Sequence, residues 1–186
     1  MKLLKVTPNK RVSLVMLITG FIVFIPFYSY NLLLVASVMD IETLQKMLLS
    51  FSIDTFSEVL RGIEQAGNLG RLAAIYYVNI VSTSALCVAL FALMLFIARA
   101  LSGKKMLEKI AYIMPFLVFA IGVLDILPSI MYILLSYKRL PVSVPVVYMI
   151  DASYMLRLFI LYAVILWLAA MGLFLAIRRL KNKGKP

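Results

Sequence analysis

Four long apolar runs, separated by segments that contain most of the charged residues, dominate the hydrophobic pattern of the chain. The runs cover residues 13–39, 72–98, 110–136 and 154–177. A helix needs about 20 residues to cross a bilayer core of about 30 Å, and each run is longer than that. In lipid, only a helix satisfies its backbone N–H and C=O groups within one segment. The pattern therefore predicts an all-α membrane protein, a four-transmembrane-helix bundle formed by residues 1–186 as a single integral membrane domain.

Basic residues lie mainly on one side of these predicted spans. The segments before the first run, between the second and third, and after the fourth contain many Lys and Arg residues and one acid, Glu108. The other side carries acidic and basic residues in similar numbers. Cytoplasmic loops are enriched in Lys and Arg, so we expect a cell-membrane protein with both termini in the cytoplasm (N-in, C-in). The basic residues of the inner segments are Lys2, Lys5, Lys10, Arg11, Arg99, Lys104, Lys105, Lys109, Arg178, Arg179, Lys181, Lys183 and Lys185.

The basic C-terminal tail predicts contact with anionic lipid head groups. Basic segments that directly follow a span are attracted to the negatively charged cytoplasmic leaflet. A nucleic-acid patch is the other interpretation of this composition, and the position next to a span argues against it. We expect the lipid bilayer as a partner and no nucleic acid.

The first outer loop, residues 40–71, is too long for a simple turn and predicts a short amphipathic helical hairpin. Asp40 is a candidate N-cap for the first helix, and Thr55 with Glu58 fits a capping box for the second. The hairpin is expected to lie on the outer membrane surface or to cap the bundle. Apolar residues recur at helical spacing, at Leu44, Met47, Leu48 and Phe51 and again at Phe56, Val59, Leu60 and Ile63.

The second outer loop contains two prolines, Pro141 and Pro145, which argue against a regular helix before the fourth run. Asp151 or Ser153 is then the expected N-cap of the fourth helix.

The composition removes several kinds of chemistry. The chain has no His and one Cys, Cys87. This excludes an intramolecular disulfide and a thiolate metal site, and it removes the side chain most often used for acid–base catalysis near neutral pH. We predict no catalytic residue, no metal site and no cofactor.

Polar residues inside the spans are concentrated in the outer halves, and Asp125 and Arg157 are the charged ones. A charge at the bilayer centre costs about 2.5–3.5 kcal/mol on insertion scales, so such residues face the protein interior and usually pair. Arg157 lies near the outer end of its run, higher than Asp125. Three interpretations remain open: a structural ion pair, an Arg157 that extends to the head groups, or a ligand or ion site anchored by Asp125. An unpaired Asp125 would instead be protonated.

A polar pocket open to the outer side is the hypothesis that follows from this depth pattern. Pro26 and Pro128 would kink two helices at the same depth and open space there. The interface belt of aromatic residues is the alternative explanation for the tyrosines. The candidate site residues are Asp125, Arg157, Asn79, Asn31, Ser82, Tyr76 and Tyr77.

Three classes of function are compatible with these patterns. The first, which the lack of a catalytic constellation and of a continuous polar path favours, is an accessory or structural component of a membrane complex, as a subunit of a larger assembly or as a homo-oligomer. The second is a ligand- or ion-binding or transport protein that uses the pocket around Asp125 and Arg157. The third is a membrane-embedded enzyme, for which Asp125 would have to act with a loop carboxylate such as Asp151 or Glu64.

Overall fold

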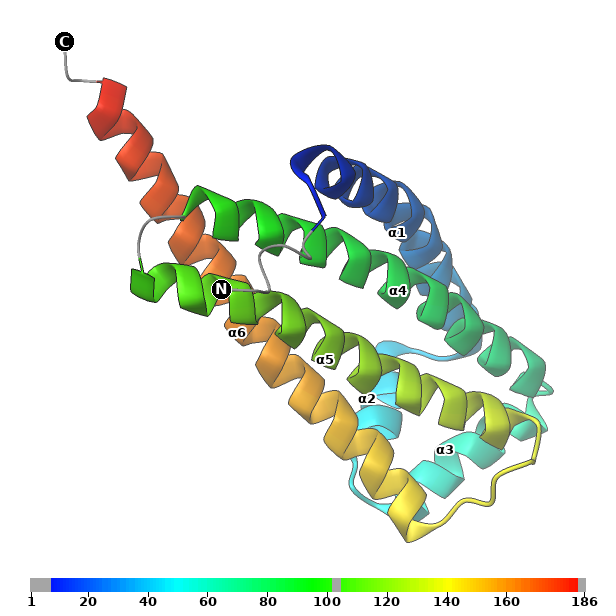
Figure 1. The fold of residues 1–186 in the computed structure, drawn as a ribbon. Coiled ribbons are helices and arrows are strands. Elements are labelled where there is room, and N and C mark those ends of the chain that lie inside the picture. Colours follow the sequence, from blue (N-terminus) through cyan, green and yellow to red (C-terminus); the bar gives the residue numbers. More distant parts are fainter. Residues whose placement is uncertain (1–7, 102–104, 184–186) are drawn as a thin grey trace.

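The computed structural model describes residues 8–101 and 105–183 and places six helices in them (Figure 1). These residues contain no strand. Four of the helices are long and apolar enough to cross a membrane, which is consistent with a multi-pass membrane protein. The predictions of an all-helical chain and of four long apolar segments are confirmed for this part of the chain. The helices are α1 (Lys10–Val38), α2 (Ile41–Leu49), α3 (Ile53–Gln65), α4 (Leu69–Ala100), α5 (Lys105–Ser136) and α6 (Val144–Lys183).

Some residues used for the orientation prediction, namely Lys2, Lys5, Lys104 and Lys185, lie outside the described residues.

The four long helices form an open row. Helix α1 packs on α4, α4 packs on α5, and α5 packs on α6. Figure 1 shows α4 and α5 side by side between α1 and α6. Helices α1 and α6 do not pack against each other along their lengths, so the row does not close into a ring. The short helices α2 and α3 lie at one end of this row, where both contact α6.

Small residues allow α1 and α4 to approach closely. A Cβ atom on Gly20 would lie 2.8 Å from the carbonyl oxygen of Ala85 and from the Cβ of Ala89. Van der Waals packing drives helix association in lipid, and small side chains bring more backbone atoms into contact. Gly20 is therefore a requirement of this interface.

The short helices are capped by different residues. Asp40 caps α2 as predicted, because its side chain accepts a hydrogen bond from the Thr43 N–H at 2.7 Å. The predicted capping box at Thr55 and Glu58 is wrong. Ser52 caps α3 and accepts from the Thr55 N–H at 3.3 Å, so Thr55 already lies inside the helix.

Residues from α2 and α3 enter the largest buried apolar cluster of the described chain. Met47 of α2 and Phe56 of α3 are fully buried and pack with Tyr76 of α4, Tyr132 of α5 and Ile150 of α6. Hydrophobic contacts therefore hold the two short helices against the ends of the spans.

Helix α6 begins at Val144, earlier than the predicted boundary at Tyr154. Pro145 is the second residue of the helix, where the backbone N–H has no intrahelical acceptor, so proline costs nothing there. The expectation that Asp151 or Ser153 caps this helix is wrong, because both lie inside it. The longer helix also changes the depth of Arg157, which lies about 20 Å along the axis from Val144 at about 1.5 Å per residue.

Candidate functional site

Asp125 of α5 and Arg157 of α6 form an ion pair between neighbouring spans. Arg157 Nη1 contacts Asp125 Oδ1, and the two side chains are 22% and 10% exposed. Asp125 lies about 17 Å from the end of α5 at Ser136, close to the depth of Arg157, at about 1.5 Å of rise per residue. The pairing removes the interpretation in which Arg157 extends to the head groups.

The second carboxylate oxygen of Asp125 is bound by side chains of α4. Asp125 Oδ2 accepts hydrogen bonds from Asn79 Nδ2 at 3.0 Å and from Thr83 Oγ1. Asn79 Nδ2 also donates to Ser129 Oγ at 3.1 Å, and Ser129 Oγ donates to the Asp125 carbonyl at 2.7 Å. A buried charge is tolerated when its remaining lone pairs find donors. This cluster meets that condition and ties α4, α5 and α6 together.

The guanidinium group of Arg157 has a second neighbour, the ring of Tyr154. The Arg157 Cζ lies 4.8 Å from the ring centroid, within the range of a cation–π contact. Arg157 Nε is buried and has no hydrogen-bond partner. Asp125 therefore uses one edge of the guanidinium, and the Nε donor remains free.

A cavity of about 170 Å³ lies beside the ion pair. Asn31 of α1 lines it, and its buried Oδ1 has no hydrogen-bond partner. Buried polar atoms in native proteins nearly always have a partner, so each exception needs an explanation. Here an unpartnered acceptor and an unpartnered donor, Arg157 Nε, belong to residues that line one cavity. Its lining residues are Asn31, Leu32, Val35, Leu44, Leu48, Ile75, Tyr76, Asn79, Leu124, Asp125, Pro128, Ser129, Tyr132, Ile150, Tyr154 and Arg157.

Stacked aromatic rings line the cavity on the side of the short helices. The rings of Tyr76 and Tyr132 lie 4.1 Å apart between centroids and are nearly parallel. Tyr132 Oη donates a hydrogen bond to the Met47 carbonyl at 3.0 Å. Leu44 and Leu48 of α2 complete this side of the lining. Helix α2 therefore covers the end of the cavity nearest the ends of the spans.

A second buried carboxylate, Asp151, holds the connection between α2 and α3. Its Oδ2 accepts a hydrogen bond from the Phe51 N–H at 2.8 Å, and the residue is fully buried. Phe51 has a φ of 48°, in the left-handed region that few non-glycine residues adopt. Asp151 therefore stabilises the strained connection between α2 and α3, and it does not cap α6 as the sequence pattern predicts.

Five of the seven predicted site residues line the cavity, namely Asp125, Arg157, Asn79, Asn31 and Tyr76.

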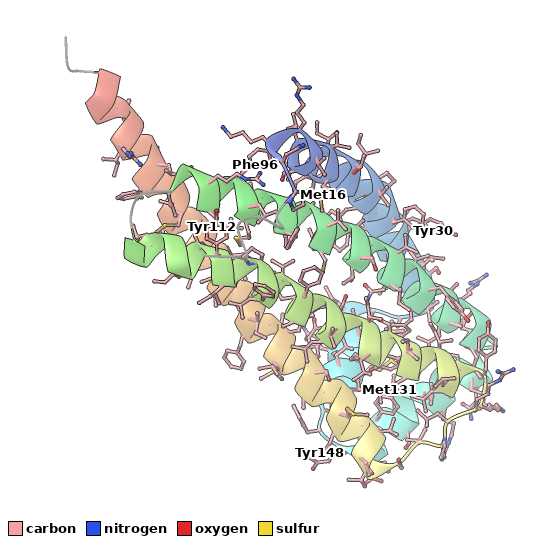
Figure 2. The ribbon with its side chains drawn as sticks, in the orientation of Figure 1. Met16, Tyr30, Phe96, Tyr112, Met131 and Tyr148 are labelled. Atoms are coloured by element: carbon pink, nitrogen blue, oxygen red, sulfur yellow. The ribbon has the colours of Figure 1, made fainter. Side chains whose placement is uncertain are left out.

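The other two predicted residues, Ser82 and Tyr77, do not line the cavity. Ser82 is buried and its hydroxyl donates to the Asn79 carbonyl at 3.0 Å. Tyr77 is half exposed. Tyr30 and Tyr148 are also exposed and point away from the body of the protein (Figure 2). The tyrosines therefore divide into a buried group beside the cavity and an exposed group typical of an interface belt.

Four residues of the site lie outside the predicted set, namely Thr83, Ser129, Tyr132 and Tyr154. Thr83 follows Asn79 by four residues, and Ser129 follows Asp125 by four. Residues at i and i+4 share a helix face, so this spacing was the signal that could have identified both. Tyr154 precedes Arg157 by three residues, a spacing that also places two side chains on one helix face.

The described residues contain no group of three or more His, Cys, Asp or Glu side chains that could hold a metal ion. Comparison with protein-family models, curated proteins and solved structures finds no match to this chain. The interpretation of the site therefore rests on its own geometry.

Proposed function

We propose that this chain is a multi-pass protein of the cell membrane, with both termini in the cytoplasm, that binds a small polar group in the cavity beside Asp125 and Arg157. The observation that carries this proposal is the coincidence of a cavity with two unpartnered polar atoms, Asn31 Oδ1 and Arg157 Nε, on its lining residues. A bound group that both accepts and donates a hydrogen bond would satisfy both atoms.

Binding has more support than catalysis. Both oxygens of Asp125 are already engaged, by Arg157 on one side and by Asn79 and Thr83 on the other. A general acid or base needs a free position within reach of the substrate proton. Asp125 is also the one carboxylate among the lining residues. Asp151 and Glu64, the loop partners considered for an enzyme, do not line the cavity; Asp151 Oδ2 accepts from the Phe51 N–H, and Glu64 pairs with Lys138.

The orientation is part of the proposal and is supported by the distribution of charge. The basic ends of α1 and α6 contact anionic lipid head groups of the cytoplasmic leaflet. Helices α2 and α3, with the cavity beneath them, then lie on the outer side of the membrane.

A second candidate function is an accessory or structural component of a membrane assembly, with another protein subunit or a second copy as partner. The uncovered sides of α1 and α6 favour it. In the most apolar stretch of each helix, 11% of the residues of α1 and 6% of those of α6 are buried, compared with 39% of those of α4. Lipid alone also covers such surfaces, and for that reason the cavity is the stronger evidence.

Native mass spectrometry of the tagged protein, extracted gently from its own membrane, separates the two candidates. Binding predicts a particle without partner proteins that retains a specific small molecule, and predicts less retention in Asn31→Leu than in the control Ser82→Ala. A stoichiometric protein partner, found together with an empty cavity, would support the accessory component. A bare particle contradicts the binding proposal.

A further inference from the structure

We infer that the occupant of this cavity is a neutral amphiphile with a hydroxyl-bearing head group, which enters sideways from the bilayer between α1 and α6. The inference rests on the proposed function and names the ligand class for the same site. Three features of the cavity lead to it: where it opens, which charges line it and which hydrogen bonds it lacks.

The side between α1 and α6 is the open one. Helices α4 and α5 pack against each other behind the cavity, and α2 covers the end nearest the ends of the spans. Helices α1 and α6 both contribute lining residues but do not pack on each other along their lengths. Leu32 of α1 lines the cavity and is 53% exposed, so the cavity reaches the surface there. That surface belongs to an apolar span, so a ligand arrives from lipid and not from water.

The lining has no net charge to offer a charged ligand. Asp125 and Arg157 are its only charged members, and they neutralise each other. An additional charge in this membrane-embedded site would lose its hydration and would lack a counter-charge to compensate for that loss. A carboxylate or phosphate head group is therefore disfavoured, and so is an amine.

The missing hydrogen bonds define the head group. Arg157 Nε needs an acceptor and Asn31 Oδ1 needs a donor. A hydroxyl group is the smallest neutral group that supplies both. The volume of about 170 Å³ has room for a small head group only. The hydrocarbon tail would remain outside, between α1 and α6 and against Leu32.

Photo-crosslinking in phosphatidylcholine nanodiscs tests the ligand class. The probes carry the same diazirine-labelled acyl chains on diacylglycerol, phosphatidic acid or triacylglycerol, and crosslinked peptides of α1 and α6 are quantified by mass spectrometry. Diacylglycerol is expected to crosslink about tenfold more than either comparison lipid. Triacylglycerol leaves a buried hydrogen bond unmade, which corresponds to roughly that factor, and phosphatidic acid brings a charge that has no counter-charge in the cavity.

Two adjacent leucines provide a matched pair of variants. Leu32→Trp fills the opening and is expected to reduce diacylglycerol crosslinking about tenfold. Leu33→Trp is the control, since Leu33 is 70% exposed and does not line the cavity. Asn31→Leu removes the acceptor and is expected to lower crosslinking of diacylglycerol but not of triacylglycerol.

Each alternative outcome overturns a defined part of the inference. Equal crosslinking by phosphatidic acid contradicts a neutral ligand, and equal crosslinking by triacylglycerol contradicts the hydroxyl group. If no lipid probe reaches these peptides while native mass spectrometry still retains a polar molecule, lateral entry is wrong and the proposed function stands. If neither experiment finds an occupant, both fail.

Discussion

Polar side chains hold the helices together in the halves of the spans next to α2 and α3, which are the outer halves under the proposed orientation, whereas in the opposite halves, the inner ones under that orientation, packing does so almost alone. In the outer half, Asp125 is bound by residues of α4 and α6, and Tyr132 and Asp151 bind the backbone at Met47 and Phe51. In the inner half, the contacts include the approach of Gly20 to Ala89. Apolar clusters there contain Met94, Val118, Ile121 and Val164, and then Ile97, Ala98, Leu101 and Ala111.

The described residues of the inner half contain a weak bond from Cys87 Sγ to the Val118 carbonyl at 3.5 Å and a polar link at the beginning of α1. Arg99 Nη1 donates to Ser13 Oγ at 3.0 Å, and Arg99 Nη2 donates to the Pro8 carbonyl. This link joins adjacent helices that already pack closely. In the outer half, hydrogen bonds instead connect elements around a cavity. The difference teaches that side-chain hydrogen bonds and the ion pair connect the elements around the cavity, whereas apolar contacts are sufficient where the helices pack closely.

The largest expected effect is loss of the ion pair. Asp125→Leu leaves Arg157 buried without a counter-charge, which is expected to lower the free energy of unfolding by about 3–5 kcal/mol. Unfolding in mixed detergent micelles with increasing SDS measures it. The double variant Asp125→Leu with Arg157→Met is expected to recover most of the loss, because an apolar pair of similar volume needs no counter-charge. A single variant as stable as the original protein would show that the outer half does not depend on the pair.

The inner half is expected to be sensitive to volume instead. Gly20→Val places methyl groups into the backbone of α4 and is expected to cost about 1–3 kcal/mol. Gly172→Val is the matched control in α6, because a Cβ atom there meets nothing within 4 Å. The same unfolding measurement compares them. Similar losses in both variants would contradict close packing of α1 on α4.

The attachment of α2 is expected to contribute less. Tyr132→Phe removes the hydrogen bond to the Met47 carbonyl and keeps the stacked ring, with an expected cost of about 1 kcal/mol. Amide hydrogen exchange in α2 should become faster in this variant. Tyr137→Phe serves as the control, since Tyr137 is exposed. Unchanged protection of α2 after Tyr132→Phe would mean that packing alone holds the helix.

The smallest expected effect is a pH dependence at the start of α2. The pKa of Asp40 lies below its ordinary value of 3.8 because its carboxylate accepts hydrogen bonds from Thr43. A group whose folded pKa is lowered stabilises the fold above its unfolded pKa, and this contribution is lost as pH falls through the folded value. Exchange protection of α2, corrected for intrinsic rates, should therefore decrease below about pH 4. Asn is an equally good N-cap that does not titrate, so Asp40→Asn should show no such decrease.

Hydropathy was sufficient to predict the spans but not all of their ends. Four apolar runs of this length have one stable form in lipid, so the long helices follow from the pattern. The beginning of α6 was misplaced because Pro145 was interpreted as a helix breaker, although proline is compatible with a first turn. That error placed Arg157 too near the membrane surface. As a result, the sequence did not show that Arg157 lies at nearly the same depth as Asp125.

The site was predictable as far as charge determines it. Intramembrane Asp125 and Arg157 must find partners, so the sequence indicates them directly. Tyr76 and Tyr77, however, are adjacent, and successive helical residues point about 100° apart. The rotation of α4 decides which of them faces the cavity. That rotation depends on contacts such as Gly20 with Ala89, which no pattern within one helix reveals.

Thiol labelling of two single-cysteine variants decides whether the polar outer half contains an accessible cavity or only a structural network. Both variants contain Cys87→Ala, which removes the native thiol. Asn31→Cys then adds a thiol at a position that lines the cavity, and Ser82→Cys adds one at a buried position that does not line it. Methyl methanethiosulfonate crosses membranes, so it reaches both positions. It reacts with the thiolate, which forms in polar surroundings but not in apolar ones. The cavity predicts labelling at least about tenfold faster at position 31 than at position 82. Equally slow labelling at both positions would contradict a ligand site and leave Asp125 and Arg157 as structural residues.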